Sequence, residues 1–168
     1  ALIAGRADET GSRLSSPELA DSLIRHSQDP SPLTRQLCAF TLGLIEGSGV
    51  EQRLRVMTED EDDNTQVNAA IALTRRGSTD GLPVFRRVLK EALKSVDPRT
   101  MDGKTEIERQ AQAEKKDAMN AVALVNVLKA VEDLYAEMDD DQATEVRQLV
   151  QPIADEFGII GIRIRAQQ

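Results

Sequence analysis

The chain has 168 residues, no tryptophan, three phenylalanines and one tyrosine. A core with so few rings has to be filled by aliphatic side chains, which are typical of closely packed helices, because strand-rich folds draw more on aromatic residues. The net charge of −8 argues against binding to nucleic acid or to an anionic membrane, since both normally require a clustered positive field. No apolar run approaches the roughly 20 residues that span a bilayer.

The chain begins with residues 1–6, whose composition resembles the closing turns of a helix. It starts without methionine and without a signal-peptide pattern, so we expect a piece of a longer array from which an N-terminal targeting sequence is missing. The cytoplasm is the favoured location. A loop rich in glycine and serine is expected over residues 8–16.

Five helices are predicted next from apolar spacing, over residues 17–28, 32–46, 49–59, 64–76 and 80–94. The first begins with Pro17 directly after Ser16, a favourable helix start. In the second, the residues at helical spacing that form its predicted apolar face are Leu33, Leu37, Phe40, Thr41 and Leu44.

The second half of the chain is predicted to be helical after an irregular insertion over residues 95–104, which holds a proline and a glycine. A long helix over 106–138 has a polar first half, which is expected to project, and an apolar second half. A last helix is expected over 142–157, where Pro152 should kink the backbone.

The final segment, residues 158–168, alternates isoleucine with glycine or arginine. This period of two is typical of extended backbone, so we expect a short edge strand or an extended tail. Self-association through its isoleucines is a further hypothesis; they are Ile160, Ile162 and Ile164.

Internal repetition is the most informative feature of the sequence. The segment from Asp29 to Gly43 aligns with the segment from Asp60 to Thr74 at an offset of 31 residues. Self-similarity at such a spacing is typical of stacked helix pairs. We therefore predict an all-α fold, an alpha-alpha superhelix or solenoid of antiparallel helix pairs, as a single domain over 1–168. Its repeats cover 17–94, and a looser helical pair covers 104–157.

The first copy resembles the HEAT-repeat superfamily, an armadillo-like group, at Asp29, Arg35, Cys38, Ala39, Thr41, Leu42 and Gly43. The resemblance implies a scaffold that binds proteins, with no catalytic residues and no cofactor, because the motif positions are packing positions. The second copy has Gln66 where the family often has arginine and Thr74 where it often has glycine. An Asp–Arg ladder between neighbouring repeats is therefore not implied at that copy.

The acidic run over residues 59–63 raises the possibility of a calcium loop. Such a loop needs glycine at its sixth position and a bidentate glutamate at its twelfth. Counted from Asp60, these positions hold Thr65 and Ile71. The favoured interpretation is a solvated turn whose carboxylates stabilise the N-terminus of the next helix. Residues 139–141 are given the same capping role.

Two single residues invite a chemical role. His26 is the only histidine, and Ser22 and Pro30 offer it no metal-binding or catalytic partner at helical spacing, so a structural or surface role is favoured. Cys38 occupies a small-residue packing position, where a buried and inert thiol is expected. No metal or catalytic site is predicted.

A basic cluster is the candidate partner-binding surface; it consists of Arg75, Arg76, Arg86, Arg87, Lys90 and Lys94. It would either meet an acidic peptide or, the favoured alternative, be neutralised by the acidic turn at 59–63 or by solvent. Nucleic acid is disfavoured because single-strand binders need stacking rings beside the charge, and Phe85 alone lies nearby.

The sequence therefore predicts a protein–protein interaction module without intrinsic catalysis, whose partner is a protein. Two alternatives stay open. The first is an enzyme accessory or a lyase-like HEAT protein of the bilin-lyase type, which rests on fold analogy alone. The second is a structural segment of a larger multidomain protein.

Overall fold

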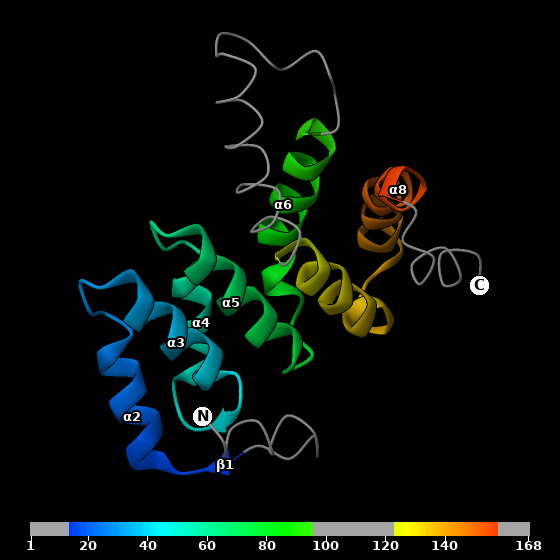
Figure 1. Cartoon of the computed structure of the whole chain (residues 1–168). Coiled ribbons are helices and arrows are strands. Elements are labelled where there is room, and N and C mark those ends of the chain that lie inside the picture. Colours follow the sequence, from blue (N-terminus) through cyan, green and yellow to red (C-terminus); the bar gives the residue numbers. More distant parts are fainter. Residues whose placement is uncertain (1–13, 96–122, 158–168) are drawn as a thin grey trace, which may run out of the picture. The chain divides into compact units, whose positions relative to one another are not determined.

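The computed structural model describes residues 14–95 and 123–157, and the chain divides into two compact units between Val84 and Phe85. The described part of the first unit is a stack of helix pairs (Figure 1). The helices are α2 (Pro17–His26), α3 (Pro32–Leu42), α4 (Val50–Met57) and α5 (Asp63–Thr74). All four lie within the ranges predicted from apolar spacing or within one residue of them.

The helix starts explain these bounds. The side chains of Ser16, Ser31 and Asp62 each accept a hydrogen bond from a backbone N–H in the first turn of α2, α3 and α5. Such caps satisfy donors that have no partner inside the helix. Helix α4 begins instead after Gly49, whose φ of 76° is readily adopted only by glycine.

Two short parallel strands form where the sequence predicted the end of a helix and a loop. Helix α3 ends at Leu42, four residues earlier than predicted, and the chain continues as strand β2 (Ile45–Glu46). It pairs with β1 (Leu14–Ser15), inside the predicted loop over 8–16. The apolar residues after Gly43 have a sequence that would also suit another helical turn. In the structure Ile45 is extended, and its side chain enters the core from strand β2.

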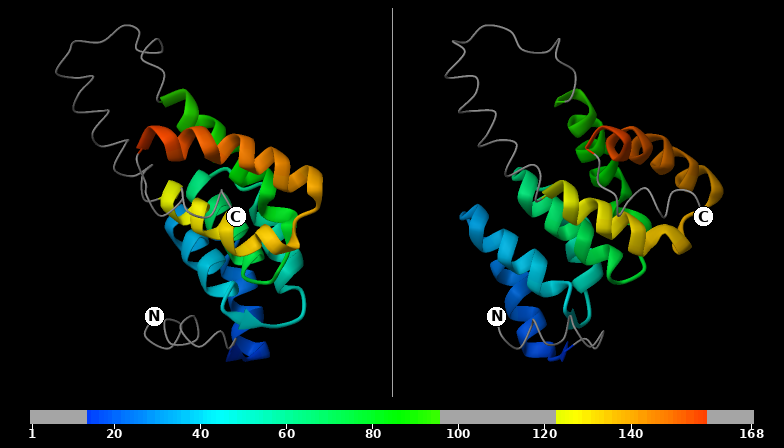
Figure 2. Two further views of the ribbon diagram at one scale, coloured as in Figure 1. Left: turned by 90° about the vertical axis from the view of Figure 1, so that its right-hand side faces the viewer. Right: turned by 45° about the vertical axis from the view of Figure 1, so that its right-hand side comes forward.

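The core of the first unit lies between the two helix pairs. Helix α3 contacts α5 most extensively, α4 packs on α5, and α2 packs on α3 (Figure 2). The fully buried side chains at its centre include Leu42, Leu54 and Leu73, one from each of three helices. Helices of the two repeats thus share one continuous core, as expected for a solenoid.

The second unit contains most of α6 (Leu82–Ser95), which follows the single turn η1 (Thr79–Gly81), then a helix over residues 123–134, η3 (Tyr135–Glu137) and α8 (Asp140–Phe157). Asp139 and Gln142 exchange backbone-to-side-chain hydrogen bonds at the start of α8, which confirms the predicted capping role. Helix α8 continues through Pro152.

Several expectations fall on residues that the structure does not describe. These are the helix remnant at 1–6, most of the insertion and the polar half of the long helix, within 96–122, and the isoleucine tail at 158–168. The single domain over 1–168 stays a prediction.

Candidate partner-binding surface

The inner face of α3 combines two small side chains, Cys38 and Ala39, with Leu42. Cys38, Ala39 and Leu42 are buried, and Ala39 and Leu42 belong to the core cluster shared with α5. Small side chains allow two helix backbones to approach closely. The inner face therefore uses the positions at which the sequence matches the HEAT motif.

Three other large apolar side chains of α3 point away from this inner face. Leu33, Leu37 and Phe40 are 62%, 58% and 40% exposed, and their i, i+4, i+7 spacing places them in one row, here called the α3 stripe. An apolar helix face is normally buried. The packing side of α3 is instead the opposite one, where Cys38, Ala39 and Leu42 are buried. A row of exposed large apolar side chains on one helix is a candidate interaction site.

The two leucines of the stripe have no apolar counterpart in the second described repeat. At the offset of 31 residues, Leu33 and Leu37 correspond to Asn64 and Asn68 of α5. The side chain of Asn68 donates a hydrogen bond to the backbone carbonyl of Gln36 at 3.3 Å. The second repeat uses this position for a contact inside the fold, so the exposed leucines are particular to the first repeat.

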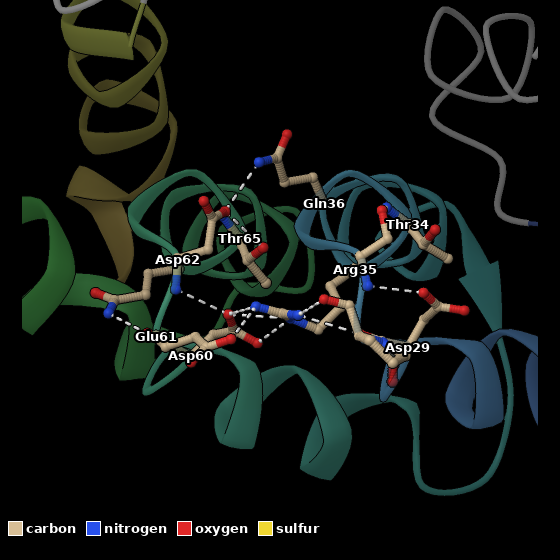
Figure 3. A network of polar contacts seen from close by, with 12 residues as sticks. Asp29, Thr34, Arg35, Gln36, Asp60, Glu61, Asp62 and Thr65 are labelled. Carbon is tan, nitrogen blue, oxygen red and sulfur yellow. Dashed lines mark hydrogen bonds and ion pairs between the residues drawn. The ribbon is translucent and has the colours of Figure 1, made fainter.

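Arg35 lies on the buried side of α3 and joins the two repeats (Figure 3). Its guanidinium binds Asp60, with Nε at 2.9 Å from Oδ2 and Nη2 at 3.0 Å from Oδ1. Nη1 donates to the backbone carbonyls of Asp29 and Pro30 at 3.1 and 3.0 Å. The exposed fractions of the Arg35 and Asp60 side chains are 7% and 11%, so water competes little for this pair. This contact is an Asp–Arg link between neighbouring repeats.

The two repeats carry the same turn before α3 and α5. Asp29 accepts from the backbone N–H of Ser31 at 2.8 Å, and Asp60 accepts from that of Asp62 at 2.9 Å. In the second repeat the amide of Gln66 donates to the backbone carbonyl of Asp60, in its own turn. An uncharged amide replaces the arginine at this copy, as its departure from the family pattern suggested.

The acidic turn over residues 59–63 has mainly a capping and linking role. Asp62 accepts hydrogen bonds at 2.8 Å from the backbone N–H of Thr65 and at 2.9 Å from the side-chain amide of Gln36. Burial acts to raise the pKa of Asp62, but the hydrogen bonds from Gln36 and Thr65 and the charge of Arg35 outweigh it and hold that pKa below its ordinary value. The predicted capping role is confirmed.

This turn keeps an excess of negative charge. The turn has five carboxylates, of which Asp60 and Glu61 pair with Arg35; the pair with Glu61 is 3.0 Å long. Glu59, Glu61 and Asp63 are exposed. Because Gln36 of α3 donates to Asp62, the acidic turn adjoins the N-terminal half of α3.

The predicted basic cluster is distributed over both units. In the first unit, Arg75 lies over the ring of Phe40, 5.1 Å from its centroid, and Arg76 donates to the backbone carbonyl of Ile45 at 3.0 Å. In the second unit, Arg86 and Lys90 share the carboxylate of Glu145 at 2.9 and 3.9 Å, and Arg87 lies 3.6 Å from Glu91. The side chain of Lys94 lies outside the described residues.

His26 and Cys38 lie in surroundings that are typical of structural residues. The Nδ1 of His26 donates to the backbone carbonyl of Ser22 at 2.8 Å, in the exposed last turn of α2. Cys38 is buried, and desolvation raises the pKa of its thiol, with a smaller contribution from Asp29. Within residues 14–95 and 123–157, no group of three or more potential ligands is placed to hold a metal ion.

Stacked antiparallel helix pairs joined by an Asp–Arg link define an α-solenoid. The sequence profile of HEAT repeats matches residues 16–99, half of the chain. The chain therefore belongs to the HEAT-repeat family, whose members generally act as scaffolds that bind other proteins and typically do not catalyse reactions. Searches among the curated proteins and the solved structures gave no significant match. None of the helices in the described residues has the length and apolarity required to cross a membrane.

Proposed function

We propose that this chain is a protein-binding scaffold module and that its partner docks on the α3 stripe. The exposure of Leu33, Leu37 and Phe40 carries this proposal. Removing large apolar side chains from water is the main favourable contribution to protein association. A partner that covers this row would gain that contribution without any rearrangement of the core beneath it.

The polar residues of the same region support binding rather than catalysis. Arg35 and Asp60 form hydrogen bonds with each other, Arg35 also donates to the adjoining backbone, and Asp62 caps α5. A catalytic group has to reach a substrate with a donor or acceptor that the fold does not already use. These side chains hold two repeats together instead.

The predicted basic cluster stays a second candidate surface. Its described members already contact Phe40, Ile45, Glu91 or Glu145. An acidic partner would therefore have to compete with contacts inside each unit. On the stripe, Arg75 contacts Phe40, but Leu33 and Leu37 are the more exposed side chains, so we rank the stripe first.

The proposal is tested with two variants of the full chain. In the first, Leu33→Asn is combined with Leu37→Asn, which places at the stripe the residues that the second repeat carries at Asn64 and Asn68. The control is Val56→Asn on α4, because Val56 is 54% exposed and lies outside the stripe. Circular dichroism verifies that both variants are folded.

Each chain is immobilised, and proteins bound from a lysate of the source organism are quantified by mass spectrometry. We expect a protein that the wild type and the α4 control enrich and that the stripe variant loses by about tenfold or more. Equal recovery with all three chains, or no enriched protein, would contradict the proposal.

A further inference from the structure

We infer that the segment that docks on the α3 stripe is an amphipathic helix with lysine or arginine at the end that lies over the acidic turn. This inference rests on the proposed function and identifies the class of partner. It follows from the shape of the apolar row and from the charge at its two ends.

The apolar row has the dimensions of a helix–helix contact. Leu33 and Phe40 are seven positions apart on α3, about 10 Å along its axis at 1.5 Å per residue. A partner helix with apolar residues three and four positions apart presents a row of the same spacing, and such rows interdigitate when helices pack. A stripe two turns long therefore fits one short helical segment.

The charge at the two ends of the row differs. The N-terminal half of α3 adjoins the acidic turn, where Glu59 and Glu61 are exposed and Arg35 pairs with Asp60 and Glu61. At the other end, the guanidinium of Arg75 lies over Phe40. A partner with its positive charge over the acidic turn gains attraction, and the reverse orientation brings like charges together. The row therefore selects both the charge of the partner and its direction.

A second copy of the chain is a poorer occupant, because each copy has a formal net charge of −8 and two such chains repel each other. Nucleic acid is repelled for the same reason. A basic helical segment of a different protein meets neither obstacle.

The test uses labelled alanine-based peptides of roughly 18 residues, long enough to form helix in water. All carry leucines at the same alternating spacing of three and four residues, and they end in three lysines, three glutamines or three glutamates. Fluorescence anisotropy with the full chain measures their affinities at low and high salt. We expect the lysine peptide to bind at least about tenfold more tightly than the glutamate peptide at low salt, with a smaller difference at high salt.

Two variants separate the apolar contribution from the electrostatic one. Leu37→Asn should weaken all three peptides about tenfold. Glu59→Gln combined with Glu61→Gln should reduce the preference for lysine severalfold and leave the affinity of the glutamine peptide unchanged. Equal binding of the lysine and glutamate peptides, or lysine-peptide binding that Leu37→Asn does not weaken, would overturn the inference.

Sedimentation velocity adds an independent outcome. A dimer of the wild type that Leu37→Asn abolishes would show that a second copy occupies the stripe, and the inference would be wrong. Stripe-dependent capture of a partner combined with peptides that show no charge preference leaves the proposed function standing and refutes the inference alone. Capture that does not depend on the stripe refutes the proposed function itself.

Discussion

Close packing between α3 and α5 predicts that a single added methyl group at Gly43 destabilises the fold. Gly43 follows α3 with a φ of −63°, so alanine meets no backbone strain there. Its Cβ would lie 2.8 Å from the Cβ of Ala72 and 3.1 Å from the Cα of Ala72, in α5. Carbon atoms prefer about 3.5–4.0 Å, so the two helices have to separate. Overpacking of this kind costs about 1–3 kcal/mol, which lowers Tm by about 2–4 °C for each kcal/mol.

A double-mutant cycle distinguishes this steric cause from a general effect of the substitution. Ala72→Gly alone should cost about 1 kcal/mol in helix propensity and about 0.8 kcal/mol for the lost buried methyl group. Combined with Gly43→Ala, it removes the carbon at 2.8 Å. We therefore expect the double variant to be about 1–2 kcal/mol more stable than the sum of the two single effects predicts.

Urea unfolding followed by far-UV circular dichroism measures all four proteins. A Gly43→Ala variant as stable as the wild type would refute the reasoning. So would a double variant whose free energy of unfolding equals the additive sum.

Three further predictions concern burial and charge. Leu54→Ala, in the core, should cost about 2–5 kcal/mol in urea unfolding, whereas Leu33→Ala, on the stripe, should stay within about 0.5 kcal/mol of the wild type; equal losses would contradict the assignment of the two faces. The pKa of Asp62 is lower in the folded state than the unfolded value of about 3.9, so its contribution to stability is present above that value and is lost as pH falls through the folded pKa. Urea titrations between about pH 5 and pH 3 should therefore show a smaller acid loss for Asp62→Asn, and an unchanged loss would refute this. The buried thiol of Cys38, whose pKa is raised by desolvation, should react with a thiol reagent such as DTNB much more slowly in the native protein than in urea; equal rates would show that it is accessible.

Local features of the fold could be predicted because their causes are local. Pro17 after Ser16 and the offset of 31 residues between Asp29 and Asp60 locate helix starts and repeats, since capping and turn formation depend on residues close in sequence. The C-terminal end of α3 was predicted less well. The residues after Gly43 are apolar in either conformation, and burial of Ile45 from a strand depends on contacts with distant segments.

The candidate surface also combines features with local causes and features that depend on distant contacts. Periodicity alone identifies Leu33, Leu37 and Phe40 as one face of a helix, but it does not state what that face meets. The small side chains of Cys38 and Ala39 were the available signal, because they mark the side on which another helix approaches. The partner of Arg35, twenty-five residues away in Asp60, likewise required the stacking of two repeats.

By itself, the sequence determined the helical class, the repeat spacing and the capped helix starts, because each follows from propensities and turn chemistry within a few residues. The tertiary structure decided which face of α3 is buried and which carboxylate Arg35 neutralises. Both depend on how closely two helix backbones approach, and Gly43 and Ala72 set that distance across 29 residues of chain. Cys38, Ala39 and Leu42 form the buried side of α3 at that contact, and Leu33, Leu37 and Phe40 stay exposed on its other side.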